Sequence, residues 1–425
     1  MPDRVPFWEA FRYWLKLGFI SFGGPAGQIS MMHQEVVEKK GWVSENHFLQ
    51  ALNFCMLLPG PEALQLAIYI GRLCNGTLGG IVAGVLFILP SIFILLGLAY
   101  VYSAFGDVPA ISAMLYGLKP AVVAIVAEAV LRIRKKSLKN WAQVLIAVAA
   151  FVGIFFLHIP FPLIVLAAGL TGWAGGKYAP GLFIVLKPKE SSGVAEVDGG
   201  RHWPRALKVI AFGLLIWFMP LALIWGGSGQ AGIFTDLGIL FSKAAVTTFG
   251  GAYAVLTYVG QEAVNHYGWI TNGQMMDGLA LAETTPGPLI MVNQFVGYVA
   301  AYSHPGALTP WEAGTLGGLL TTWVTFLPSF IFVLALAPYV ERLRRNVRLS
   351  GALSAITAAV VGVVLNLGVT FTFHSVVRDT GGMDFYPLVT AVTFFVGIQY
   401  RNWPMVPVIA GSAVMGFLWK SFVVL

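Results

Sequence analysis

Apolar stretches of about 20 residues follow one another along the chain, separated by short polar segments, and this is the length that a helix needs to cross a bilayer. A transmembrane β-barrel would instead show short segments of alternating polarity. We therefore predict an all-α polytopic membrane protein with about 13 spans, or about 10 to 13 if some segments re-enter the membrane. The predicted spans are residues 8–30, 47–71, 77–104, 110–131, 141–158, 161–184, 206–226, 234–260, 274–302, 313–338, 350–373, 386–400 and 403–423.

A polar segment rich in Gly, Ser, Lys and Glu interrupts this apolar pattern at residues 187–205, and its composition is that of a linker. One additional span follows it, at residues 206–226. We predict three parts of the chain. They are an N-terminal repeat at 1–184, a cytoplasmic linker with the extra transmembrane helix at 185–230, and a C-terminal repeat at 231–425.

The two outer parts repeat one another in sequence. Residues 22–61 recur at 249–288 with a constant offset of 227 residues and no gap. Further matches have offsets of 238 and 244, so we infer short loop insertions in the second copy and about six segments in each repeat. The matched positions are Phe22-Gly23-Gly24 with Phe249-Gly250-Gly251, Gln34-Glu35 with Gln261-Glu262, Gly41-Trp42 with Gly268-Trp269, Pro59-Gly60-Pro61 with Pro286-Gly287-Pro288, Gly76–Gly80 with Gly314–Gly318, Leu89-Pro90-Ser91 with Leu327-Pro328-Ser329, and Gly172 with Gly416.

The orientation of the repeats follows from the number of spans between them. Six spans and the linker span separate equivalent points, and because their sum is odd we expect the copies to be inverted in the membrane. With the N-terminus in the cytoplasm, 17 Lys and Arg residues fall on the cytoplasmic side, and Lys39, Lys40 and Arg378 fall clearly outside. Basic loops favour the cytoplasm, so we predict a cytoplasmic N-terminus and an external C-terminus.

The composition excludes a water-soluble body, because 57% of the residues are hydrophobic and 11% are charged, against about 25% charged residues in soluble domains. The net charge of +7 is a topology signal, and we expect no nucleic-acid partner. The two cysteines, Cys55 and Cys74, suggest neither a disulfide framework nor a metal motif. The sequence contains no zinc-protease, serine-hydrolase or phosphate-binding-loop motif. We therefore expect neither enzymatic activity nor a cofactor or metal.

Glycine and proline break the first predicted span of each half, at Gly23-Gly24-Pro25 and at Gly250-Gly251. Glycine weakens a helix and proline removes a backbone donor, and in lipid the freed groups must be satisfied by protein or by a water-filled cavity. The N-terminus of a half-helix exposes N–H groups that bind anions. With Ser21, Gln28 and Thr248 nearby, the pattern predicts an oxyanion cradle. The alternative is close helix packing through small residues.

A second pair of breaks, Pro59-Gly60-Pro61 and Pro286-Gly287-Pro288, lies in later apolar segments with polar flanks. No helix runs straight through Pro-Gly-Pro. A repeated, interrupted hydrophobic segment is also the sequence feature that best indicates the binding site of a transporter. We predict discontinuous or hairpin-like helices near the middle of the membrane, and the alternative is a loop at the membrane surface.

Ionisable residues within the predicted spans are few, and such residues are functional candidates. Lys119 is a candidate to attract an anion or to pair with a carboxylate such as Glu62, and its alternative is an anchor that extends to the membrane interface. Glu62 and Glu283 flank the Pro-Gly-Pro breaks. Each is a candidate to carry a proton coupled to transport, and the alternative for each is a helix cap.

Two segments resemble signatures of the chromate ion transporter family: Ser21-Phe22-Gly23-Gly24-Pro25-Ala26-Gly27-Gln28 the N-terminal one, and Phe249-Gly250-Gly251-Ala252-Tyr253-Ala254-Val255-Leu256 its C-terminal counterpart. The resemblance covers nearly the whole chain. It implies a long-chain, bidomain, gradient-driven carrier of a bacterial-type inner membrane, which exports chromate and so confers resistance. The motif residues that it assigns to the site are Phe22, Gly23, Gly24, Pro25, Gln28, Phe249, Gly250, Gly251 and Tyr253.

The second signature departs from the first, with Ala252 and Tyr253 where the first has Pro25 and Ala26, so we expect the two copies to play unequal roles in binding. Sulfate has the same charge and shape as chromate. A sulfate or other oxyanion transporter or exchanger is therefore the alternative function, and a passive channel or a membrane-embedded enzyme is a further one. Coupling ion, direction and homodimerisation stay open.

Overall fold

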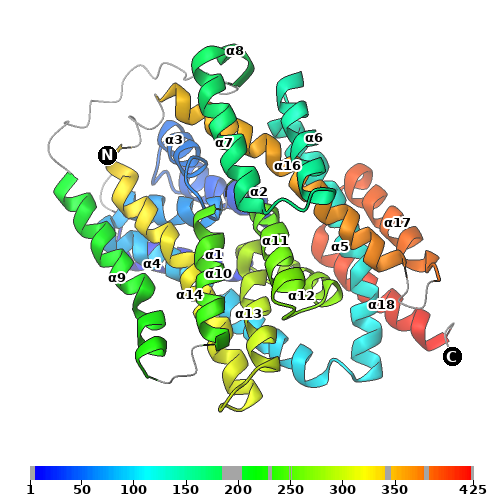
Figure 1. The fold of residues 1–425 in the computed structure, drawn as a ribbon. Helices are drawn as coiled ribbons and strands as arrows, with labels where there is room; N and C mark the ends of the chain where they lie inside the picture. The colour runs from blue at the N-terminus through cyan, green and yellow to red at the C-terminus, as the bar shows by residue number, and fades with distance from the viewer. Residues whose placement is uncertain are drawn as a thin grey trace.

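The computed structural model describes residues 5–183, 203–227, 232–247, 249, 251–339, 346–377 and 382–422, and these residues form helices and one isolated bridge between Val377 and Met383 (Figure 1). The first half contains α1 (Phe7–Ile20), α2 (Gly24–His33), η1 (Gln34–Lys39), α3 (Glu45–Cys55), α4 (Glu62–Phe105), α5 (Pro109–Ser137), α6 (Trp141–Phe155), α7 (Phe161–Tyr178) and α8 (Pro180–Phe183). The connecting helix is α9 (Trp203–Gly227). The second half contains α10 (Gly232–Thr247), α11 (Ala252–Gly260), η2 (Gln261–His266), α12 (Asn272–Thr284), η3 (Leu289–Met291), α13 (Val292–Ser303), α14 (Pro310–Leu336), η4 (Ala337–Tyr339), α16 (Val347–Val376), α17 (Phe385–Arg401) and α18 (Met405–Phe422). The all-α prediction is confirmed for these ranges.

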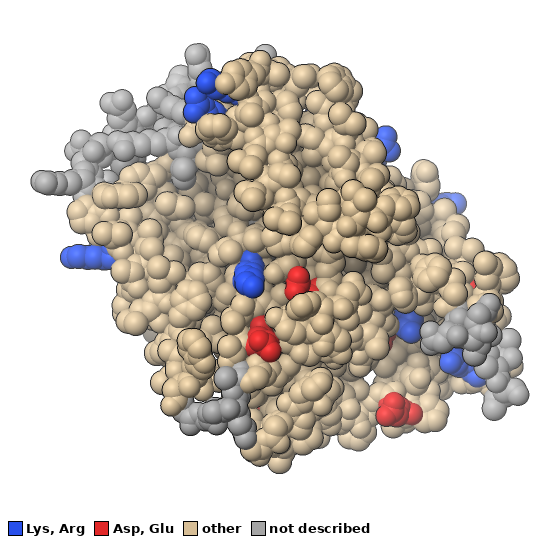
Figure 2. All heavy atoms as spheres, viewed as in Figure 1, with Lys and Arg blue, Asp and Glu red and all other residues tan. Residues whose placement is uncertain are grey.

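Six helices in the described ranges are long and apolar enough to cross a membrane. They are Glu62–Phe105, Pro109–Ser137, Trp203–Gly226, Pro310–Tyr339, Val347–Val376 and Met405–Phe422. Charged side chains are sparse on the face drawn in Figure 2, as expected of a surface that meets lipid. These features agree with a polytopic membrane protein. They do not confirm the predicted number of 13 spans.

The sequence repeat is also a repeat of backbone conformation. The π-helices η1 and η2 start at Gln34 and Gln261, which differ by the 227-residue offset. The helices that follow start after equivalent capping residues, Ser44 and Thr271, whose hydroxyls accept hydrogen bonds from backbone N–H groups at 3.4 and 3.1 Å. Such caps satisfy N–H groups that the first turn leaves unpaired. The local sequence therefore determines the same sequence of elements twice.

The predicted span at residues 8–30 is a helical hairpin in the structure. The helix breaks between Ser21 and Gly23, and the chain then turns back. The evidence for the turn is that the Lys40 ammonium lies 2.6 Å from the Glu9 carboxylate. The rings of Tyr13 and Trp42 are also in contact, with centroids 5.4 Å apart. Lys40 therefore lies at the same end of the hairpin as Glu9. A single crossing at residues 8–30 would place Lys40 across the membrane from Glu9, so it does not fit this contact.

The predicted span at 47–71 is a second hairpin. Its arms are α3 and the start of α4, and the rings of Phe54 and Tyr69 face each other across it with centroids 5.6 Å apart. The chain then turns again inside α4 at Asn75 and Gly76, where Gly76 has φ of +69°. A Cβ at Gly71 would lie 2.5 Å from the Cβ of Ala83, so the two parts of α4 run side by side in opposite directions.

The second half contains the corresponding pair of hairpins. The helix α10 packs on α11, and the break between them lies at Gly251, where φ is +107°. The helices α12 and α13 also lie side by side, since a Cβ at Gly278 would collide with the ring of Phe295. The predicted spans 234–260 and 274–302 are thus each interrupted by a change of direction.

Long helices of one half pack against those of the other. Gly172 of α7 meets Gly351 of α16, and Gly416 of α18 meets Gly117 of α5. Gly172 and Gly416 are equivalent in the repeat, so the last long helix of each half, α7 or α18, packs on the other half. Small residues permit such close backbone approach. The helix α9 lies at the edge, beside α14 (Figure 1), and Trp217 bonds the Val324 carbonyl at 3.1 Å.

Candidate functional site

The tip of the first hairpin is joined to the Pro-Gly-Pro turn of the second half. The amide of Gln28 donates to the carbonyls of Ser21 at 3.0 Å and Gly287 at 2.6 Å. The N–H of Gly287 donates to the Ser21 carbonyl at 3.0 Å. Ser21 and Gln28 are fully buried. Motifs that lie 259 residues apart in the chain are therefore held together by a buried polar network.

Each Pro-Gly-Pro turn packs against a serine of the opposite half. A Cβ at Gly60 would lie 2.7 Å from Oγ of Ser329, and a Cβ at Gly287 would collide with Ser91. Ser91 also donates to the carbonyl of Pro286. The serines belong to the repeated Leu-Pro-Ser motif, so the exchange is reciprocal. The absence of a side chain at Gly60 and Gly287 is what permits these contacts.

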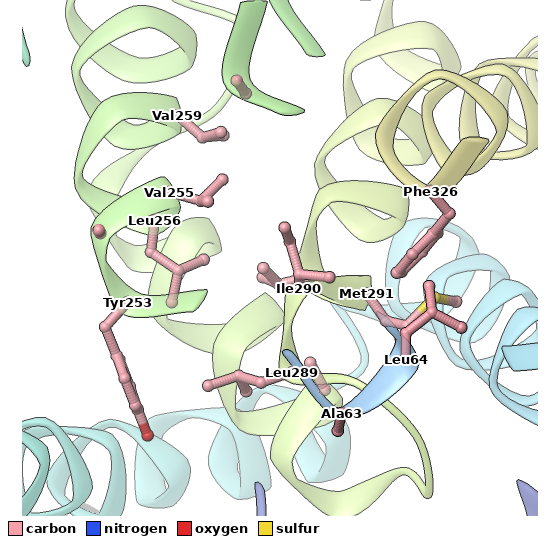
Figure 3. Packing of buried hydrophobic residues seen from close by; sticks show 14 of the residues in the cluster. Ala63, Leu64, Tyr253, Val255, Leu256, Val259, Leu289, Ile290, Met291 and Phe326 are labelled. Carbon is pink, nitrogen blue, oxygen red and sulfur yellow. The ribbon is translucent and has the colours of Figure 1, made fainter. Parts of the chain in front are cut away.

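The second arm of every hairpin begins at a tip. These arms are α2, starting at Gly24, α4, starting at Glu62, α11, starting at Ala252, and η3 with α13, starting at Leu289. Figure 3 shows side chains from the starts of α4, α11 and η3 in one buried cluster. Helix N-termini carry partial positive charge and unpaired N–H groups. The starts of these three arms therefore bring partial positive charge close together inside the protein.

Several buried polar atoms around the tips have no hydrogen-bond partner among the described residues. They are Oγ of Ser21, Oε1 of Gln28, Oε1 of Gln65, and both side-chain polar atoms of Asn293. Asn293 is 1% exposed. Unpaired buried polar groups cost free energy, so their presence here suits a ligand or water. Asn293 and Gln65 were recognised in the sequence only as polar flanks, and Ser91 and Ser329 only as parts of a repeat.

The two coupling candidates occupy different environments. Glu283 is 7% exposed and accepts a hydrogen bond from the hydroxyl of Tyr253 at 2.7 Å. Glu62 is the first residue of α4 and is half-buried, a position where a carboxylate also stabilises the helix dipole. Lys119 lines a cavity together with Asp277, away from the tips. No ion pair joins Lys119 to Glu62 among the described side chains.

The remaining candidates are tip residues. Phe22 is 38% exposed, Phe249 is half-buried, and Pro25 lies in the first turn of α2, where its missing N–H is tolerated. Pro61 and Pro288 immediately precede α4 and η3, and Pro59 accepts a bond from Gln65 at 2.6 Å. Thr248 and Gly250 lie outside the described residues.

Paired broken helices that meet inside an apolar helical bundle are typical of membrane transporters. Comparison with known proteins identifies the family: the chain belongs to the chromate transporter family, whose sequence model matches residues 8–173 and 235–417. Each matched range contains the two hairpins of one half of the chain. The family consists of transporters, so enzymatic activity is not expected of this chain.

Relatives are similar over most of their length. A chromate transport protein of Pseudomonas aeruginosa is 32% identical over 86% of this chain and 80% of its own length. A chromate transport protein of Cupriavidus metallidurans is 28% identical over 96% of this chain and 91% of its own. An uncharacterized transporter of Methanocaldococcus jannaschii is 26% identical over 96% of this chain and 93% of its own. No solved structure matches this chain.

Substitutions at two tip glycines test whether substrate binds beside the hairpin tips. A Cβ built at Gly24 or Gly251 has no heavy atom within 4 Å, so a larger side chain enters open space. We expect Gly24→Leu and Gly251→Leu to abolish transport and to insert into the membrane at wild-type levels. The measurements are chromate accumulation in cells and the amount of protein in the membrane fraction.

The matched control is Gly41→Leu. Gly41 also has a positive φ, +60° against +68° at Gly24, and open surroundings, but it lies at the far end of the hairpin. Equal losses of transport in the Gly41 and Gly24 variants would attribute the effect to backbone strain and contradict the prediction.

Proposed function

We propose that the protein is a secondary-active transporter that exports chromate from the cytoplasm and thereby confers chromate resistance. The observation that carries this proposal is the convergence of helix N-termini at the hairpin tips, joined by the Gln28 contacts to Ser21 and Gly287. A tetrahedral dianion accepts hydrogen bonds on every oxygen, and N–H groups at helix starts supply donors. The names of the relatives support chromate as the substrate.

Glu283 is the residue that we propose carries a coupled proton. Its hydrogen-bond partner Tyr253 lies in the first turn of α11, next to one hairpin tip. Glu283 itself lies in the last turn of α12, next to another hairpin tip. A charged carboxylate accepts a stronger hydrogen bond than a neutral one. Protonation of Glu283 would therefore loosen the link between the two hairpins. Glu62, at the start of α4, is the second candidate.

The hairpins support a topology of nine crossings and four re-entrant hairpins. The proposed crossings are the part of α4 after Gly76, then α5, α6, α7, α9, α14, α16, α17 and α18. Five of them separate equivalent points of the two halves. Because five is odd, the repeats at 1–184 and 231–425 would still be inverted around the linker 185–230, with the N-terminus in the cytoplasm and the C-terminus outside. Basic side chains at the C-terminal end of α5, namely Arg132, Lys135 and Lys136, then line a cavity on the cytoplasmic side.

Cysteine reporters at two equivalent positions distinguish this topology from 13 crossings. Lys39 and His266 are exposed and occupy matching ends of η1 and η2. We expect a membrane-impermeant maleimide to label His266→Cys in intact cells and Lys39→Cys only after permeabilisation. Thirteen crossings require the reverse assignment. The unsubstituted protein, with buried Cys55 and half-buried Cys74, gives the background.

Uptake by inside-out vesicles tests the proposed function directly. Export from cells corresponds to uptake by such vesicles, so we expect accumulation of chromate that collapses when an uncoupler dissipates the ion gradient. Flux that persists unchanged with the uncoupler indicates a passive channel. Absence of chromate flux refutes chromate as the substrate.

Sulfate is the second candidate substrate, because neither helix N-termini nor amide groups distinguish two tetrahedral dianions of equal charge. Competition in the same vesicles compares them. Sulfate uptake that excess chromate leaves unchanged favours the alternative function, a sulfate transporter or exchanger.

A further inference from the structure

A polar cavity lies away from the hairpin tips. Its volume is about 420 Å³, and it lies between α4, α5, α12, α13 and α18. Gln274 and Ser303, from the two open ends of the α12–α13 hairpin, both line it. In the nine-crossing topology the cavity opens on the outer face. None of the residues at the four hairpin tips contributes to its walls.

Asp277 of α12 is a buried carboxylate in the wall of this cavity. It is 6% exposed, and its Oδ2 accepts a hydrogen bond from the hydroxyl of Tyr102 at 3.0 Å. Its Oδ1 is buried without a hydrogen-bond partner among the described residues. A buried charge that lacks partners is costly. The free oxygen is therefore suited to hold a proton that a ligand in the cavity can accept as a hydrogen bond.

Two ammonium groups line the same cavity. Lys119 of α5 is half-buried, and its Nζ lies close to Gly273 at the start of α12. Lys420 of α18 is exposed, and its Nζ lies 4.9 Å from the centre of the Tyr116 ring. Neither lysine forms an ion pair within the part of the chain that the structure describes. Both remain available to an anion.

Other titratable groups surround Asp277 from the neighbouring elements. They are Tyr102 on α4, Asp107 between α4 and α5, Tyr116 and Lys119 on α5, Tyr302 on α13, Lys420 on α18, and His374 on α16, which contacts Asn272 at 3.1 Å. Asp107 is exposed at the rim. Asp277 is thus the buried carboxylate of the cavity, and Asp107 is an exposed carboxylate with which to compare it.

We propose that this cavity is a second oxyanion site, in which a tetrahedral dianion binds Lys119 and Lys420 while Asp277 carries a proton. Ionised Asp277 would repel a dianion and compete for Lys119. Protonated Asp277 donates from Oδ1 while Oδ2 keeps its bond to Tyr102. Anion and proton therefore each favour binding of the other. The inference rests on the proposed oxyanion transport and assigns the cavity as the outer binding site on that route.

The test measures equilibrium binding of labelled sulfate, which remains a dianion throughout, to the purified full-length protein in lipid nanodiscs between about pH 5 and pH 9, a range that covers the titration of buried carboxyl groups. The Gly24→Leu background isolates this cavity from the hairpin tips. We expect affinity to fall by about tenfold per pH unit above a midpoint, because one proton binds with each anion. Asp277→Asn should keep the low-pH affinity throughout. Lys119→Gln should weaken binding at every pH by about tenfold or more.

Control variants separate a local role from a general one. Asp107→Asn should keep the wild-type pH profile, and Lys177→Gln, on the exposed end of α7, should keep the wild-type affinity. Tyr102→Phe removes the hydrogen bond to Asp277 and should move the midpoint to higher pH, which provides a second measurement if Asp277→Asn does not fold.

Two results would overturn the inference: a wild-type pH slope in Asp277→Asn, or wild-type affinity in Lys119→Gln. A wild-type pH midpoint in Tyr102→Phe would also count against it. If the protein without substitutions transports chromate or sulfate into vesicles, these results leave the proposed function standing. The proposed function fails separately, when the unsubstituted protein transports neither chromate nor sulfate.

Discussion

Gly287→Ala is expected to abolish chromate uptake by vesicles and to lower the thermal stability of the purified protein. Gly287 has φ of +108°, and an added Cβ collides with Ser91 of the opposite half. The same residue accepts from Gln28 and donates to Ser21. We expect a backbone cost of about 1–2 kcal/mol and a packing cost of about 1–3 kcal/mol. The methyl group would separate the tips that form the proposed site.

The reciprocal contact provides graded controls for this result. In Gly287→Ala, the additional change Ser91→Gly removes the colliding hydroxyl and should restore part of the stability. Gly60→Ala should have the weaker effect, because its added Cβ meets only the ends of two side chains, Oγ of Ser329 at 2.7 Å and Nε2 of Gln65 at 2.8 Å, and neither approach is as close as that of Ser91 to a Cβ at Gly287. Wild-type transport by Gly287→Ala would show that the packing between halves is not needed for function.

Glu283→Gln is expected to abolish accumulation of chromate against its gradient while leaving exchange at equal concentrations measurable. The amide can still pair with Tyr253, whose hydroxyl lies 2.7 Å from the carboxylate, but it cannot take up a proton. Removal of the titratable group therefore removes coupling without removing the contact. The measurement is vesicle uptake with and without an imposed proton gradient, alongside counterflow of labelled chromate.

Two further variants decide whether the effect belongs to coupling. Tyr253→Phe leaves a titratable Glu283 and should keep gradient-driven uptake at a reduced rate. Glu312→Gln changes a surface carboxylate that caps α14 through Thr309, a role that glutamine can share, and should transport normally. If Glu283→Gln accumulates chromate as the wild type does, Glu283 is not the coupling residue, and Glu62 becomes the candidate to test.

The positions of the helix breaks were predictable because they depend on local chemistry. Pro-Gly-Pro stops a helix wherever it occurs, and the structure ends α12 and starts η3 on either side of Pro286-Gly287-Pro288. Positive φ values at Gly24 and Gly60, +68° and +118°, likewise follow from glycine itself. The duplication made these local signals recognisable twice.

The direction of the chain after each break was not predictable from the apolar pattern. An apolar stretch of sufficient length has the composition of one crossing whether it continues or turns back. The contact between Lys40 and Glu9 decides for a hairpin, and it joins residues from opposite ends of the stretch. The surroundings of Lys119 are a similar case. The sequence suggested Glu62 as a carboxylate that could pair with it, whereas in the structure Lys119 lines a cavity together with Asp277 of α12.

By itself, the sequence determined the membrane class, the two repeats, the helix breaks and the family, because composition, motif spacing and proline geometry are properties of short segments. Only the tertiary structure decided that hairpin tips meet, that Gly60 packs on Ser329 and Gly287 on Ser91, and that Asp277 lines a polar cavity. These facts depend on contacts between residues far apart in the chain. Such contacts are selected by the packing of whole helices, which no local pattern encodes.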